Sequence, residues 1–263
     1  MPKVSVTVIT KNEAADIGAA LASASWADEL IVVDCGSADE TAAIAREHTR
    51  HVVVHEWEGY PAQKNFAASL ASHDWILSLD ADERVTPALA AEIQRTLQQT
   101  PTCQAFRIPR VTQHLGRWIR TTDWYPDYQV RLYDRRSAQW TGRYVHETLT
   151  VNGGLGQLRG ELEHYAYRDI ADHLDTIDHY TTLAARQMRE DGRRAGWLQI
   201  AGHPPLAFLR NYLLKGGITS GVPGLIISAM NAYYVFLKFA KLWELQVAGT
   251  VHHEDTKATT NTK

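Results

Sequence analysis

Four short apolar runs alternate with helical patterns in the first third of the chain, and this alternation restricts the fold more than any other feature. The runs cover residues 4–9, 30–33, 51–54 and 75–79. They are rich in β-branched residues, which is typical of strands buried on both faces of a parallel sheet. Strands separated by helices predict right-handed βαβ units, and therefore an α/β fold with a doubly wound, mostly parallel sheet.

The segments between these runs carry signals for helix starts. Ser37 and Glu40 have the spacing of a capping box in front of residues 41–48. Thr86 followed by Pro87 is typical of an N-cap and a first helical residue. Apolar residues then recur on one face of the predicted helix, at Leu89, Ile93 and Leu97.

The regular alternation of strand and helix patterns ends in the second half of the chain. Aromatic and Gly-containing segments over residues 112–163 predict mixed strands and loops. Helical patterns prevail from Ile170, with a second candidate helix over residues 204–215. We therefore expect an α/β domain over residues 1–168 in two halves (about 1–110 and about 111–168), a helical extension over 169–246 and a disordered tail over 247–263.

The helical extension contains one long uncharged segment. Residues 216–237 carry no charge, and Lys238 and Lys241 follow them. The length raises the question of a membrane span, but several glycines and polar residues make the segment only modestly apolar. Residues 235–243 look amphipathic, which favours a helix at the membrane interface over a span. A helix packed on the catalytic domain is the alternative.

Charge and cysteine content exclude several classes of protein. The formal net charge is −3 and no long basic stripe occurs, which argues against a nucleic-acid partner. Cys35 and Cys103 form no spacing pattern, as expected in a reducing compartment. The apolar run near the N-terminus is too short for a signal peptide. We therefore expect a cytoplasmic protein.

Polar and acidic residues follow three of the four predicted strands. Thr10-Lys11-Asn12-Glu13 follows the first, a segment from Asp34 to Thr41 the second, and Asp80-Ala81-Asp82-Glu83 the fourth. The carboxyl ends of parallel strands meet at one sheet edge, where ligands bind. Asp80 and Asp82 are two residues apart, so extended geometry would place them on one face. Two such carboxylates suit Mg²⁺ or Mn²⁺, which bind through a few carboxylates and substrate phosphates.

These stretches resemble family 2 glycosyltransferases, which have the GT-A fold. The matching pieces are VTVITKNEAADI, LIVVDCGSADETAAIA, PAQKNFAAS and WILSLDADERVTP. The resemblance implies a GT-A type sheet with a C-terminal helical extension and a site for a UDP-sugar. Residues 1–168 would then be the catalytic domain, with the nucleotide-sugar half over about 1–110 and the acceptor half over about 111–168. Asp34 would accept a hydrogen bond from the base, expected to be uracil. Asp82 would ligate the metal, and Asp80 would approach the ribose or the metal. Donor-side residues are expected at Thr10, Asn12, Glu13, Asp34, Gly36, Ser37, Gln63, Lys64 and Asp80.

Transfer to an acceptor hydroxyl requires charge neutralisation and a general base. A carboxylate-held divalent ion would neutralise the leaving nucleoside diphosphate. A single displacement assisted by one base inverts the anomeric centre. Asp127 is the preferred base and Glu147 the alternative. Arg131 offers bidentate geometry for the diphosphate, and His146 is a candidate further metal ligand.

The second half of the chain resembles bacterial lipopolysaccharide core glycosyltransferases of family 2. The matching pieces include GRWIRTTDWYPDYQVRLY, VHETL, LRGELEHYAYRD, HPPLAFLRNYLLKGG and YVFLKFAKLWEL. The resemblance implies transfer of a hexose, expected to be glucose, to an inner-core sugar or another glycolipid acceptor. It also implies a peripheral position on the cytoplasmic face of the inner membrane.

Four other classes of protein share part of this pattern. A dinucleotide-dependent dehydrogenase would need G-x-G-x-x-G after the first strand, where Thr10-Lys11-Asn12-Glu13 stands instead. A sugar nucleotidyltransferase would carry a Gly-rich basic loop there. A non-catalytic nucleotide-binding module is a third class, against which the D-x-D pattern argues. A polyprenyl-phosphate glycosyltransferase is the closest alternative and would usually carry clear membrane spans.

Overall fold

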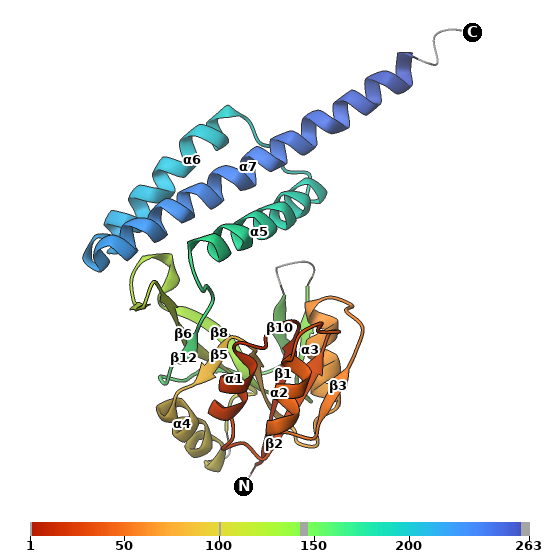
Figure 1. Ribbon diagram of the computed structural model, residues 1–263, viewed down its shortest axis with the longest axis vertical. Coiled ribbons are helices and arrows are strands. Elements are labelled where there is room, and N and C mark those ends of the chain that lie inside the picture. The colour runs from red at the N-terminus through yellow and green to blue at the C-terminus, as the bar shows by residue number, and fades with distance from the viewer. Residues whose placement is uncertain (1, 100, 143–146, 259–263) are drawn as a thin grey trace. The chain divides into compact units, whose positions relative to one another are not determined.

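The chain divides into two compact units in the computed structural model, which describes residues 2–99, 101–142 and 147–258. Residues 1–120 and 124–166 form the first unit, and residues 121–123 and 167–263 form the second (Figure 1). The first unit ends two residues before the expected boundary at residue 168. The three residues that interrupt it were not anticipated.

The parallel half of the sheet has the four strands expected from the apolar runs: β1 (Val4–Thr10), β2 (Glu29–Asp34), β3 (Val52–Val54) and β4 (Trp75–Asp80). They pair in the order β3-β2-β1-β4, and all run parallel. The register pairs Thr10 with Asp34 and Ile9 with Asp80, so β1, β2 and β4 end almost level with one another. The predicted α/β fold is confirmed.

The sheet continues past β4 with strands from the region predicted only as mixed. β8 (Asp127–Asp134) pairs antiparallel with β4 and is followed by β6 (Ala105–His114), β12 (Leu162–His164) and β5 (Glu83–Val85). β7 (Arg117–Ile119) and β11 (Leu155–Gln157) also pair with β6, and β9 (Ala138–Thr141) and β10 (Thr148–Val151) form a separate pair. The β5–β12 register sets His164 opposite Glu83. The last strand of the unit thus returns to the chain segment that follows β4.

The helices of the first unit are α1 (Ile17–Ser23), α2 (Thr41–His48), α3 (Tyr60–Ser69) and α4 (Pro87–Gln98). The N-cap prediction for α4 is confirmed, because the Thr86 hydroxyl accepts a 3.2 Å hydrogen bond from the Leu89 amide. The capping box predicted for α2 is wrong. Glu40 is the N-cap and makes no side-chain cap, and Ser37 instead contacts Asp34.

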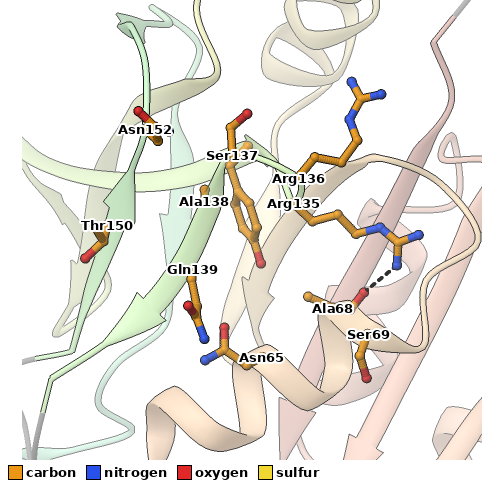
Figure 2. Close-up of a pocket in the computed structure, with 11 residues that line it drawn as sticks. Asn65, Ala68, Ser69, Arg135, Arg136, Ser137, Ala138, Gln139, Thr150 and Asn152 are labelled. Carbon is orange, nitrogen blue, oxygen red and sulfur yellow. Dashed lines mark hydrogen bonds between the residues drawn. The ribbon is translucent and has the colours of Figure 1, made fainter.

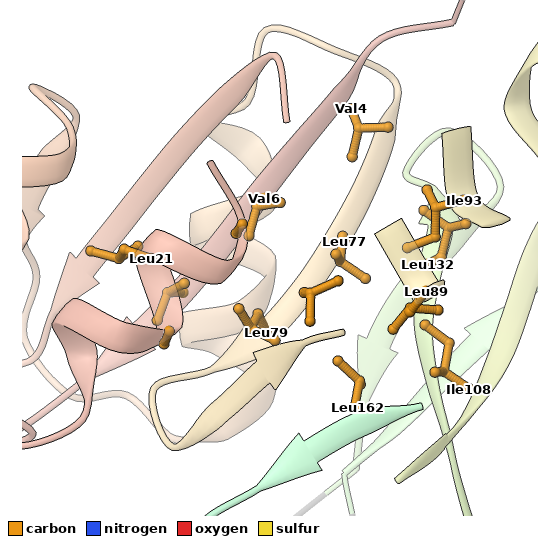
Figure 3. Close-up of a cluster of buried hydrophobic side chains, with 14 of the residues drawn as sticks. Val4, Val6, Leu21, Leu77, Leu79, Leu89, Ile93, Ile108, Leu132 and Leu162 are labelled. Carbon is orange, nitrogen blue, oxygen red and sulfur yellow. The ribbon is translucent and has the colours of Figure 1, made fainter. Parts of the chain in front are cut away.

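Apolar side chains from β1, β4 and the helices converge on one core (Figure 3). Leu77 of β4, Leu21 of α1 and Ile93 of α4 are completely buried there. Full burial of a side chain of this size stabilises the fold by about 1.5–3 kcal/mol. The core therefore holds the strand ends in fixed positions.

The second unit is helical: α5 (Ile170–Glu190), α6 (Trp197–Leu209), a π-helical turn η2 (Arg210–Leu214), a 3₁₀ turn η3 (Gly217–Ser220) and α7 (Gly221–Ala258). Helices α5 and α6 both pack on α7 (Figure 1). The helix expected over residues 204–215 begins earlier, at Trp197, and contains Pro204 and Pro205. Helix α7 continues to Ala258, past residue 246, where we expected the ordered chain to end.

The inserted segment 121–123 belongs to the helical unit through backbone contacts. The Thr122 amide donates to the Lys215 carbonyl over 2.8 Å, and the Asp123 amide donates to the Asn211 side-chain oxygen over 2.9 Å. A short 3₁₀ turn, η1 (Thr122–Trp124), begins in this segment. The chain consequently passes between the two units three times.

Candidate functional site

The loop after β1 folds against the loop after β2. Asn12 adopts a positive φ of 57°, and its side-chain oxygen accepts a 2.8 Å hydrogen bond from the Ala38 amide. Its own amide donates to the Ser37 hydroxyl over 2.9 Å. The Glu13 amide donates to the Thr41 hydroxyl over 2.8 Å. The expected donor residues of these two loops are therefore held together, and Thr41 is a contributor that sequence reasoning missed.

Asp34 and Thr10 lie beneath these loops at the paired ends of β1 and β2. Asp34 is buried, and its carboxylate accepts from both the amide and the hydroxyl of Ser37. The Thr10 hydroxyl is also buried, and it has no hydrogen-bond partner among the described residues. Gly36 has a φ of +78°, which a residue with a side chain adopts only at a cost.

Gln63 of α3 is completely buried next to this edge. Its amide nitrogen lies 2.9 Å from the Cys35 sulfur, and its oxygen lies 2.6 Å from His55 Nδ1. Both ends of the amide are thus engaged by protein groups. These contacts tie α3 to the loop after β2, which gives Gln63 a structural role in addition to the expected place beside the donor.

Asp80 at the end of β4 lies between two cations. Lys64 Nζ is 3.3 Å from its carboxylate, and Arg131 of β8 bonds its other oxygen. Burial alone would raise the pKa of Asp80, but the charges of Arg131 and Lys64 outweigh it and hold the pKa well below its usual range. Asp80 is therefore ionised and already largely neutralised by the protein.

Glu83 extends this charge network, although the sequence interpretation gave it no role. Its carboxylate is completely buried and lies 2.6 Å from Arg131 and 3.0 Å from Arg110 of β6. The Asp80 amide donates to its other oxygen over 3.1 Å. A buried carboxylate requires such partners, since an unpaired one is strongly destabilising. No local sequence pattern could reveal Arg110, because it arrives from a distant strand.

The two candidate bases lie at opposite ends of this network. Asp127, at the start of β8, is 2.6 Å from Arg110 and also accepts a 2.7 Å hydrogen bond from Gln129. Glu147 lies 3.1 Å from Lys64, the residue that also faces Asp80. Both carboxylates are partly exposed. The predicted residues Lys64, Asp80, Arg131, Asp127 and Glu147 are therefore brought together by one chain of ion pairs.

Asp82 stands apart from that network and pairs with a histidine. His164 Nε2 of β12 is 3.2 Å from the Asp82 carboxylate, and Nδ1 of the same ring is 3.1 Å from the Thr112 hydroxyl. Burial alone would raise the pKa of Asp82, but the hydrogen bond and charge of His164 lower it. No local sequence pattern links His164 to the D-x-D segment, so the sequence alone did not bring these two residues together.

The D-x-D segment can contribute only part of a metal coordination shell. No group of three His, Cys, Asp or Glu side chains within the described ranges is arranged to hold a metal ion. The other expected ligand, His146, lies outside the described residues. Asp82 and His164 supply an oxygen and a nitrogen ligand, and both Mg²⁺ and Mn²⁺ commonly complete their shells with substrate phosphates.

A separate polar pocket of about 500 Å³ lies at the other end of β8 (Figure 2). Its lining includes Tyr133, Arg135 and Gln139. Tyr133 pairs with Ile76, four residues before Asp80 on β4, and the lining also includes Asn65, which follows Lys64 in α3. It contains none of the predicted site residues.

The chain is similar to known proteins over most of its length. The sequence profile of the family described as Glycosyl transferase family 2 matches residues 5–152, which is more than half of the chain. The matched range contains the strand ends of β1, β2 and β4 and both candidate bases.

Relatives extend the similarity over nearly the whole length. The lipopolysaccharide core biosynthesis glycosyltransferase LpsC of Rhizobium meliloti (strain 1021) is 29% identical over 247 residues, covering 91% of this chain and 92% of that protein. An uncharacterized glycosyltransferase of Rickettsia felis (strain ATCC VR-1525 / URRWXCal2) is 30% identical over 258 residues, covering 93% of this chain and 90% of that protein.

A solved structure shares the fold. The mannosyltransferase PcManGT from Pyrobaculum calidifontis, in complex with GDP-Man and Mn²⁺, has a TM-score of 0.56 and 16% identity, covering 92% of this chain and 88% of that chain. At this identity the likeness concerns the fold alone. The family profile and the full-length relatives carry the assignment: the chain belongs to glycosyl transferase family 2.

Proposed function

We propose that this chain is a metal-dependent inverting hexosyltransferase that moves a sugar from a UDP-sugar to an inner-core sugar of lipopolysaccharide. The observation that carries the proposal is the level ending of β1, β2 and β4, which gathers Asp34, Asp80 and the following Asp82 at one sheet edge. Ligands of open α/β sheets bind at this edge.

The nucleoside would lie over the ends of β1 and β2. The buried Thr10 hydroxyl, which lacks a partner among the described residues, supports a ligand contact there. Ser37 donates once to each oxygen of Asp34, so lone pairs remain for an N–H group of the base. Uracil, which offers one such N–H, is the base we propose.

A divalent cation would be held by Asp82 with His164. Asp82 is about one third exposed and forms no ion pair with a Lys or Arg among the described residues, although the charge of Arg110 helps to lower its pKa, whereas Asp80 is paired with two cations. This distribution favours Asp82 as the principal ligand and leaves Asp80 to orient Lys64 and Arg131. His146 is retained as a further ligand. The bound ion would stabilise the negative charge that develops on the leaving diphosphate.

Arg131 remains part of the proposed donor side, acting through Asp80. Its Nη2 bonds both Asp80 and the completely buried Glu83, whereas both carboxylate partners of Lys64 are partly exposed. These contacts support a positioning role more strongly than a direct grip on the diphosphate. Lys64, which reaches the same carboxylate, is the cation we propose to face the donor.

Asp127 is the proposed general base, with Glu147 as the alternative. Either carboxylate would accept the proton of the acceptor hydroxyl as that oxygen attacks the anomeric carbon and the bond to the diphosphate breaks. One displacement without a covalent intermediate gives inversion. Asp127 accepts hydrogen bonds from Arg110 and Gln129, which fix its orientation.

The acceptor follows from the similarity to LpsC, whose name assigns it to lipopolysaccharide core biosynthesis. We propose a core sugar or related glycolipid as acceptor, glucose as the transferred hexose, and peripheral attachment to the cytoplasmic face of the inner membrane. A polyprenyl-phosphate acceptor is the alternative. The described chain contains one helix, 217–248, that is long and apolar enough to cross a membrane, and one such helix is weak evidence for a span.

The test is UDP release from UDP-glucose with delipidated inner-core fragments as acceptor. We expect release to require Mn²⁺ or Mg²⁺, to stop on addition of EDTA, and to rise with acceptor. Asp82→Ala should abolish it, while Asp74→Asn at the opposite end of β4 serves as the matched control. UDP binding without turnover would redirect the search to another donor or acceptor, and undiminished turnover in EDTA would overturn the metal assignment.

A further inference from the structure

The helical unit exposes an unusual amount of apolar surface on α6, η2 and α7. Trp197 and Leu206 of α6 are 75% and 64% exposed, Leu214 of η2 is 83% exposed, and Val222 of α7 is 69% exposed. No residue of α6 is buried, and the helix has no charged side chain. Contiguous exposed apolar surface of this kind marks an interaction site.

The exposed side chains of α7 follow a helical stripe. They recur every three or four residues, apart from one interval of seven, at Val222, Leu225, Tyr233, Phe236, Trp243 and Val247, with the small residue Ala229 exposed between Leu225 and Tyr233. The other side of α7 contributes to the unit's own core, since Phe239 and Leu242 pack with Ala185 and Met188 of α5. The stripe is therefore a solvent-facing surface of a helix whose opposite face is already occupied.

The charge of this region has one sign. Residues 192–243 contain six basic residues and no acidic one, although the whole chain has a net charge of −3. Arg193 and Arg194 precede α6, and Arg210 and Lys215 follow it. Arg210 pairs with Asp123, but no ion pair engages Arg193, Arg194 or Lys215 among the described residues. Exposed basic groups thus stand at both ends of an exposed apolar helix.

We infer that the surface formed by α6, η2 and the α7 stripe docks flat on a bilayer that contains anionic lipids. Apolar side chains would enter the acyl boundary, and the flanking basic groups would meet lipid phosphates. Exposed Trp197, Tyr233 and Trp243 have the amphipathic rings that favour this depth. This deepens the peripheral attachment in the proposed function and is independent of the sugars transferred.

A membrane span fits these contacts less well. Helix α6 has 13 residues, whereas a span needs about 20. In α7, Lys241 donates to the Asp178 carboxylate and to the hydroxyls of Thr181 and Thr182 on α5. Helix α5 carries charged residues along its length. A helix bound to such a neighbour is held at the protein surface rather than in hydrocarbon.

The test is cosedimentation of the full chain with vesicles of phosphatidylcholine alone or mixed with phosphatidylglycerol. We expect binding to the mixed vesicles, weakened by salt, and little binding to the neutral ones. The triple variant Arg193→Gln, Arg194→Gln, Lys215→Gln should lose about fivefold in affinity for each charge removed. The triple variant Arg46→Gln, Arg50→Gln, Arg95→Gln on the first unit controls for net charge, because it removes the same number of positive charges.

Replacement of exposed apolar residues by glutamate tests the apolar contribution to docking. Leu206→Glu and Leu214→Glu should each lower vesicle affinity by about tenfold or more, whereas Leu155→Glu, at a site 52% exposed on the first unit, should not. These positions are exposed, so unchanged thermal unfolding would verify the fold. UDP release with delipidated acceptor, measured on the same variants, keeps failure of docking distinct from failure of catalysis.

Three outcomes would overturn the inference. The first is vesicle binding that is absent, or equal in wild type and the α6–η2 variants. The second is a dimer, detected by light scattering, that Leu214→Glu dissociates, because a second copy would then cover the surface. The third is resistance of the native membrane-bound protein to alkaline carbonate extraction, which would indicate a span.

Discussion

Lys64 Nζ lies 3.3 Å from the carboxylate of Asp80, although the first residue belongs to α3 and the second ends β4. The lysine side chain is only 3% exposed. A charge so enclosed is retained where it meets carboxylates or a ligand, since desolvation without partners is costly. The contact links the position of α3 to the edge at which we propose the donor to bind.

Replacement of that lysine should impair transfer. We expect Lys64→Gln to lower kcat/KM for the UDP-sugar by about tenfold to a hundredfold, because a cation facing the developing charge is lost. It should also lower the free energy of unfolding by about 1–3 kcal/mol, since two carboxylates lose their partner. Steady-state kinetics and urea unfolding would measure both effects, with exposed Lys3→Gln as control. Unchanged kinetics would remove Lys64 from the donor side.

Acid should destabilise the first unit through Asp80 and Asp82. Both have a folded-state pKa below the ordinary value of 3.8, so both stabilise the fold above that pH. This contribution is lost as the pH falls below about 4 toward the folded-state values. Urea unfolding between about pH 6 and pH 3 should show the loss, and Asp80→Asn should reduce its steepness. An identical slope in the variant would contradict the assignment.

His164 should influence metal affinity without being required for the fold. We expect His164→Ala to weaken Mn²⁺ binding in the presence of UDP by about tenfold to a hundredfold, as a lost ligand or ligand-orienting group does. Mn²⁺ binding can be followed by electron paramagnetic resonance, independent of turnover. His179→Ala on α5, away from the D-x-D segment in sequence and in a different unit, is the matched control. Equal affinities for the two variants would exclude His164 from the metal site.

The two candidate bases can be distinguished by separating binding from transfer. Asp127→Asn should leave UDP affinity within about twofold and lower kcat by about 10²–10⁴-fold, because an amide cannot accept the proton. Glu147→Gln should have the smaller effect on kcat. If the order is reversed, Glu147 is the base and Asp127 serves to orient Arg110.

Backbone geometry predicts an effect at Gly36. Its φ of +78° is costly for any residue with a side chain, although a Cβ would meet no atom within 4 Å. We expect Gly36→Ala to lower the free energy of unfolding by about 1–2 kcal/mol through strain alone. Gly202→Ala in α6, which also has free space, should be neutral or stabilising by up to about 1 kcal/mol. Equal effects would indicate that the loop relaxes.

The sequence predicted the parallel half of the fold well because its signals are local. Apolar runs define buried strands regardless of partners, and the Thr86-Pro87 pair specifies a helix start by itself. Asp34, Asp80 and Asp82 could be placed at one edge because parallel strands share a direction. The GT-A fold class and the family could therefore be predicted from the sequence alone.

The network of ion pairs around Asp80 and Glu83 could not be predicted from the sequence, because its members come from distant parts of the chain. Arg110 and Glu83 meet because β6 and β5 flank β12, and this order follows from long-range pairing rather than from periodicity. His164 reaches Asp82 by the same return of the chain. The candidate helix was expected to begin at residue 204, but α6 begins at Trp197, contains Pro204 and Pro205, and changes to a π-helical turn directly after it ends.

The three-residue insertion 121–123 has a consequence for how such chains can be recombined. These residues lie in the middle of the first unit's sequence but bond to Lys215 and Asn211 of the helices. A single crossover near residue 166 would therefore combine the helices of one parent with residues 121–123 of the other, and the hydrogen bonds between them would not be matched. Chimaeras with a relative should unfold cooperatively only when residues 121–123 and the helices come from the same parent. The two units therefore cannot be exchanged independently at one junction.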